Sequence, residues 1–73
     1  MAFTRADREK AQEHIRAGEK LLAQQRQVVD ELAADGRPVG AARELLAELD
    51  ETVELMKAHL KVVNADLARR GES

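Results

Sequence analysis

The feature that most constrains the fold is one interruption, Asp35-Gly36-Arg37-Pro38, between two long stretches that contain no proline. Glycine suits the left-handed residue that ends a helix, and proline cannot continue a helix because it lacks an amide proton. Alanine, leucine, glutamate and arginine, all strong helix formers, dominate both stretches. We therefore predict an all-α chain with a helix over residues 4–35, a turn over 36–38 and a second helix over 39–70.

The capping residues expected at the ends of these helices differ in strength. Thr4 is a good N-cap, and Asp7 three residues later predicts an imperfect capping box, because glutamate is the usual residue there. Val39 and Gly40 offer no capping oxygen at the start of the second helix. Gly71 is expected to end it.

Both helices carry apolar residues at alternating steps of three and four, the spacing of helices packed along their length. We call these residues the seam. They are Ala11, Ile15, Gly18, Leu22, Gln25, Val29 and Leu32 in the first helix, and Ala42, Leu46, Leu49, Val53, Met56, Leu60, Val63 and Leu67 in the second. The pattern predicts a long antiparallel two-helix hairpin that resembles a coiled coil.

The register of the hairpin follows from the seam, because facing positions in an antiparallel pair have numbers that add to a constant. A sum of 74 or 75 pairs Leu22 with Val53 and places the small Gly18 opposite the long Met56. The same register places Gln25 opposite Leu49 as a polar layer that fixes the alignment.

One flank of the seam is charged on both helices. The register brings Glu19 beside Lys57 and Arg26 beside Asp50, with Gln12 beside Asn64. Exposed pairs of this kind contribute roughly 0.2–1 kcal/mol each, so we expect them to fix register more than stability.

The other flank is apolar and wider than two helices can cover. We call it the open face, and it consists of His14, Leu21, Val28, Leu45, Leu55, His59 and Val62. A chain of 73 residues forms a single domain, here residues 1–73, with a small core and no cysteine for disulfides, so association is expected. We predict a homodimer that forms a four-helix bundle. A different protein partner and a stable monomer are the alternatives.

His14 and His59 are the only histidines, and the register places both on the open face. Imidazole nitrogens bind zinc, and protonation of paired histidines opposes association, so a metal-binding or pH-sensing protein is the alternative function. The simpler interpretation is that both are half-buried boundary residues, because neither lies at the usual spacing of metal ligands.

Other classes of function lack a signal. The 12 basic and 14 acidic residues are interleaved, and no cluster of aromatic residues is present to stack on bases, so we expect no binding to nucleic acid. There is no phosphate-binding loop and no nucleophile beside a histidine, so we expect neither an enzyme nor a cofactor. The charged N-terminus and the lack of a long apolar run predict no signal peptide, no membrane contact and a cytoplasmic location. The sequence favours a non-enzymatic protein-interaction module with an accessory or regulatory role.

A further pattern extends over nearly the whole chain: His14-Ile15, Gly18-Glu19, Gln25-Arg26, Leu32, Gly36, Leu45-Leu46 and His59. It resembles short uncharacterised bacterial proteins that are predicted to be helical hairpins. Where those proteins usually have threonine or aspartate before the second helix, this chain has Pro38-Val39-Gly40. The resemblance implies the fold, and it implies no activity and no site residues.

Overall fold

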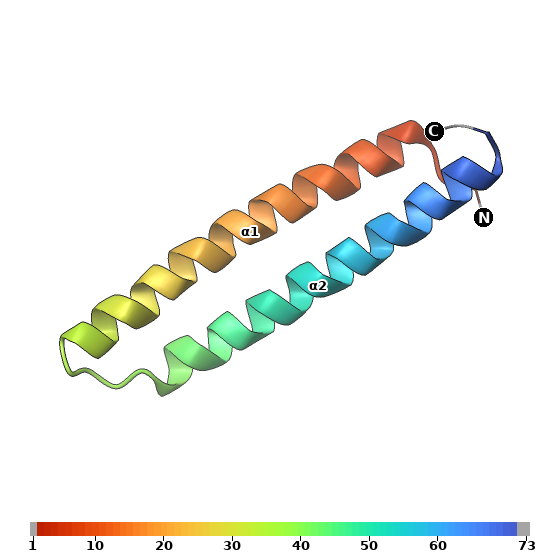
Figure 1. The fold of residues 1–73 in the computed structure, drawn as a ribbon. Helices are drawn as coiled ribbons and strands as arrows, with labels where there is room; N and C mark the ends of the chain where they lie inside the picture. The colour runs from red at the N-terminus through yellow and green to blue at the C-terminus, as the bar shows by residue number, and fades with distance from the viewer. Residues whose placement is uncertain (1, 72–73) are drawn as a thin grey trace.

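The computed structural model describes residues 2–71 and consists of two antiparallel helices joined by a short turn (Figure 1). Helix α1 spans Arg5–Ala34 and helix α2 spans Gly40–Arg69. The predicted all-α hairpin is confirmed. Each helix is one residue shorter at both ends than predicted, because the four flanking residues are caps. Residues 1, 72 and 73 of the predicted single domain lie outside the described part.

The first helix begins with a complete capping box. The Thr4 hydroxyl accepts a hydrogen bond from the Asp7 N–H at 3.2 Å, and the Asp7 carboxylate accepts one from the Thr4 N–H at 2.8 Å. The capping box predicted at Thr4 and Asp7 is therefore confirmed, and it is complete because the shorter aspartate side chain still reaches the backbone.

The turn ends α1 through a left-handed glycine, as predicted. Gly36 has a φ of 68°, and the N–H of Arg37 donates to the Leu32 carbonyl at 2.9 Å. These features form the closing motif that satisfies free carbonyls at the end of a helix. Val39 caps α2 without a side-chain hydrogen bond, so the start of α2 is the weaker one, as expected. Gly71 has a φ of 74° and follows the end of α2.

The core of the hairpin is the seam. Every seam residue is buried or half-buried in the structure, which places the line of contact between α1 and α2 where the spacing predicts it. The buried apolar side chains in the described residues are Ala11, Leu22, Val29, Val53, Val63 and Leu67. This short set is the whole of the deeply buried apolar core over residues 2–71, and most other seam residues remain in partial contact with solvent.

Gly18 provides the closest approach of the two helices. A Cβ atom added at this position would lie 2.9 Å from Cγ2 of Val53 and 3.5 Å from Sδ of Met56. Val53 is almost fully buried, so its stiff side chain has no room to move away. The small residue expected opposite Met56 thus accommodates both side chains.

Gln25 is the polar residue of the seam, and it binds across the hairpin. Its Nε2 donates a 2.9 Å hydrogen bond to the Ala42 carbonyl oxygen. The partner lies seven residues closer to the turn than Leu49, the residue predicted to face Gln25. The register does not predict this bond. It aligns backbone positions, whereas the long, flexible glutamine side chain can reach an acceptor further along the other helix.

The hairpin is elongated. Its principal extents are 54 × 14 × 12 Å, and its radius of gyration of 16.5 Å exceeds the about 11 Å of a compact domain of this length. It exposes 5439 Å², whereas a compact monomer of this mass would expose about 4,500 Å². Across residues 2–71, neither helix combines the length and the apolar character that a membrane crossing requires.

Candidate partner interface

The apolar residues of the open face remain exposed in the hairpin. Their exposed fractions are 52% for Leu21, 42% for Val28, 45% for Leu45, 66% for Leu55 and 58% for Val62. These are large side chains, and burial of such a side chain contributes about 1.5–3 kcal/mol. The hairpin therefore leaves a large apolar contribution to stability unused.

These side chains lie on one face of the molecule. Leu21 and Val28 on α1, and Leu45 on α2, occupy the helix column next to the seam. Leu55 and Val62 lie one column further out on α2. Because α1 and α2 pack along their whole length, the columns form one continuous stripe parallel to the long axis.

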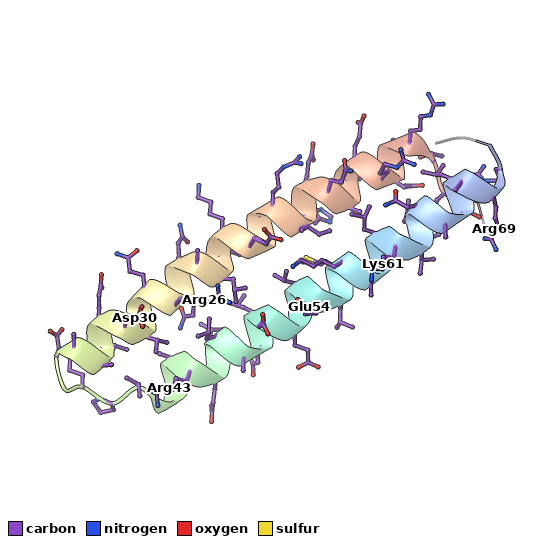
Figure 2. All side chains as sticks on the ribbon, viewed as in Figure 1. Arg26, Asp30, Arg43, Glu54, Lys61 and Arg69 are labelled. Atoms are coloured by element: carbon purple, nitrogen blue, oxygen red, sulfur yellow. The ribbon has the colours of Figure 1, made fainter. Side chains whose placement is uncertain are left out.

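The opposite face is polar. Lys57 Nζ lies 3.5 Å from the Glu19 carboxylate across the hairpin, and 3.7 Å from the Glu54 carboxylate on its own helix. These residues line a shallow open hollow together with Leu22, Arg26, Asp50 and Val53. Figure 2 shows Arg26 and Glu54 along the space between the helices, with Arg43 near the turn and Arg69 at the other end.

Two of the predicted cross-hairpin pairs are not direct contacts. Arg26 and Asp50 line the same hollow, but the ion pairs within 4.0 Å among residues 2–71 do not include them. The hydrogen bonds of the same residues likewise do not join Gln12 to Asn64. Both pairs are exposed, and water competes effectively for such side chains.

The two histidines have different surroundings. Both are exposed rather than half-buried, and His59 on α2 packs edge-to-face against the Phe3 ring, with 5.6 Å between ring centroids. In the described part of the chain, no three His, Cys, Asp or Glu side chains are grouped to hold a metal ion. A site at these histidines would therefore need further ligands from a second molecule.

The structure brings together a group of residues that the sequence pattern did not predict as a cluster. We call it the terminal cluster, and it consists of Phe3, His59, Asp66, Arg69 and Arg70. The Asp66 carboxylate accepts a 3.0 Å hydrogen bond from the Phe3 N–H and lies 3.2 Å from both arginine Nη2 atoms. Arg70 also donates to the Phe3 carbonyl oxygen. The cluster fastens the N-terminal segment to the end of α2.

Asp66 is only 9% exposed, yet it carries its charge easily. The hydrogen bond from the Phe3 N–H lowers the pKa of Asp66 below its ordinary value of 3.8, and the charges of Arg70 and Arg69 lower it further. Burial raises the pKa more than either arginine charge lowers it, but the lowering influences together outweigh burial. The carboxylate thus stays ionised and organises the donors around it.

The sequence contains a pattern that could have indicated the ion pairs of the terminal cluster. Asp66 continues the column of Leu45, Thr52 and His59 at steps of seven, and arginines follow it three and four residues later. That spacing predicts ion pairs on a helix face. The contact with Phe3 carried no such signal, because it depends on how the chain enters α1.

Comparisons of the chain with models of protein families, with curated proteins and with solved structures gave no match. The resemblance to short bacterial hairpin proteins accordingly stays a prediction.

Proposed function

We propose that this protein is a non-enzymatic interaction module that works as a homodimer, in which two hairpins pack through their open faces into a four-helix bundle. The role that suits such a module is accessory or regulatory. The observation that carries the proposal is the stripe of five large apolar side chains that are 42–66% exposed on one face.

The size of the face supports a second copy as the occupant. A rectangle of the two larger extents, 54 and 14 Å, covers roughly 750 Å², close to the about 800 Å² that each partner contributes to a standard interface. A second hairpin has the same length and the same unpaired stripe, so it covers this face from end to end. An isologous contact of this kind is the commonest form of homodimer.

The energetics of the single hairpin also favour association. The deeply buried apolar side chains of residues 2–71 are few, and one of them, Ala11, is small. In a chain of this length, a single core rarely supplies more than about 3–5 kcal/mol, and natural proteins of this size often add disulfides, a metal or a partner. With no cysteine in the sequence, a partner is the route that the open face provides.

The test is the mass in solution by analytical ultracentrifugation at micromolar concentration. We expect a dimer, and a well-folded monomer would overturn the proposal. The variant Leu21→Glu with Val28→Glu places charges on the open face, and we expect it to raise the dimer dissociation constant at least roughly 100-fold, since each unpaired buried charge costs several kcal/mol.

A matched variant controls for added charge. Ala23 on α1 and Ala47 on α2 are exposed and lie outside the open-face columns. Replacing both with glutamate adds the same charge, and we expect the dimer to persist. Equal loss of the dimer in both variants would show that total charge, rather than the open face, governs association.

A further inference from the structure

We propose that the two hairpins associate with their turns at opposite ends of the bundle, so that α1 packs antiparallel on the partner's α1 and α2 on the partner's α2. This orientation rests on the homodimer proposed above. It specifies where the twofold axis crosses the hairpin and which charged residues meet across the interface.

A pair of hairpins stacked through the same face has two symmetric arrangements. If the twofold axis runs along the bundle, both turns lie at the same end, and α1 covers the partner's α2. If the axis runs across the bundle, the turns lie at opposite ends, and each helix covers its own copy. Both arrangements bury the open face, so other residues have to distinguish them.

When α1 packs antiparallel on the partner's α1, its exposed residues form compatible pairs. Beside the open-face residues of α1 lie Lys10, Ala17, Gln24 and Glu31, all exposed and one column further out. In the opposite-end arrangement, facing residues have position numbers that add to 41 or 42. The pairs are Lys10 with the partner's Glu31, Ala17 with the partner's Gln24, His14 with the partner's Val28, and Leu21 with the partner's Leu21.

The exposed residues of α2 give a related match, in which each pair joins a residue of the column next to the seam to one of the outer column. With position numbers that add to 107, each apolar residue of this helix again faces an apolar or small polar one. The pairs are Leu45 with the partner's Val62, Thr52 with the partner's Leu55, and Glu48 with the partner's His59. These residues are all exposed in the hairpin.

One axis satisfies both helices. The centre of the α1 pairs falls at Leu21, and the centre of the α2 pairs falls between Val53 and Glu54. Leu22, the neighbour of Leu21, lines the same hollow as Val53 and Glu54, so the two centres lie at one level of the hairpin. The structure sets the level of the two helices relative to each other, and the position numbers of the pairs set the two centres.

Charge also favours opposite ends. This arrangement joins Lys10 to the partner's Glu31, and twofold symmetry repeats the pair. It places Asp7 opposite the partner's Asp35, with the partner's Arg37 two residues further on. The same-end arrangement brings His14 beside the partner's His59 and Asp7 beside the partner's terminal cluster, and in these columns it has no counterpart to the pair of Lys10 with Glu31.

The distance between the two turns decides the question. The chain has no cysteine, so Arg37→Cys, exposed in the turn, carries a single nitroxide label per protomer. By electron–electron double resonance, we expect labels about 50 Å apart, roughly twice the rise from the axis to the turn. The same-end arrangement places them about 10–20 Å apart, one or two interhelical spacings.

The mass in solution and the distance between labels together distinguish a wrong orientation from the absence of a homodimer. A dimer by mass with the short distance overturns the opposite-end arrangement and leaves the homodimer standing. A monomer by mass, with no dipolar coupling, overturns both. A dimer with the long distance supports both.

Exchanging the charges of Lys10 and Glu31 tests the same arrangement independently of the distance between labels. Lys10 and Glu31 lie 21 residues apart on one straight helix, about 31 Å, so they cannot meet within a protomer. We expect Lys10→Glu or Glu31→Lys alone to raise the dimer dissociation constant about 3–10-fold, and the double exchange to restore it. Failure of the double exchange to restore association would overturn the pairing.

Discussion

The backbone N–H of Phe3 donates a 3.0 Å hydrogen bond to the carboxylate of Asp66, a residue 63 positions further along the chain. This bond joins the segment that enters α1 to the last turn of α2. It lies at the open end of the hairpin, where no covalent turn holds the helices together (Figure 1). The terminal cluster therefore closes the end that the chain connectivity leaves free.

We predict that Asp66→Ala lowers the midpoint of thermal unfolding, because the Phe3 N–H and both arginine side chains lose their acceptor. Asp66→Asn keeps an oxygen for Phe3 but loses the charge, so we expect a smaller decrease. Asp30→Asn, at an exposed carboxylate on α1, is the matched control and should leave the midpoint unchanged. Equal midpoints for all three variants would contradict a role of the cluster in stability.

The same carboxylate predicts a dependence of stability on pH. Because folding lowers the pKa of Asp66, its contribution is fully present above the ordinary carboxyl pKa of 3.8. It is lost as the pH falls from there through the lower pKa of the folded protein. Chemical denaturation between pH 2 and 6 should show the wild-type protein and Asp66→Asn converging in free energy of unfolding at the acidic end. A constant difference across this range would count against the assignment.

We predict that Gly18→Ala destabilises the hairpin by about 1 kcal/mol. The new methyl group would lie 2.9 Å from Val53, and overpacking costs about 1–3 kcal/mol, which outweighs the roughly 0.5–1 kcal/mol that alanine gains in a helix. Gly40→Ala is the matched control, because a Cβ there meets no atom within 4 Å. Urea denaturation should show a small gain for Gly40→Ala. A gain for Gly18→Ala as well would show that the helices separate freely at this point.

Gln25 permits a prediction about its amide group. Gln25→Glu preserves the shape but removes the donor to the Ala42 carbonyl, so we expect a loss of roughly 1–3 kcal/mol in the free energy of unfolding. Gln25→Leu removes the polar group altogether, and we expect a change within about 1 kcal/mol, because buried apolar surface offsets the lost hydrogen bond. Denaturation curves at neutral pH measure both. The reverse order would show that the hydrogen bond is not what holds this residue in place.

The sequence by itself determined the hairpin. The helix-forming residues and the break at Gly36 and Pro38 specify two helices and a turn. The steps of three and four in the seam then specify that the two helices pack along their length, which buries the apolar side chains. The exposed columns followed from the same periodicity. A periodic pattern specifies faces well, because a side chain's direction on a helix depends only on its position number.

Only the tertiary structure decided which polar side chains actually meet. Glu19 reaches Lys57 whereas Arg26 and Asp50 remain apart, and Gln25 selects the Ala42 carbonyl rather than the layer of Leu49. The contact of Phe3 with Asp66 was also beyond the sequence pattern. Long polar side chains have many rotamers of similar energy, and a non-helical segment has no period, so these contacts are fixed by the surrounding three-dimensional packing rather than by spacing along the chain.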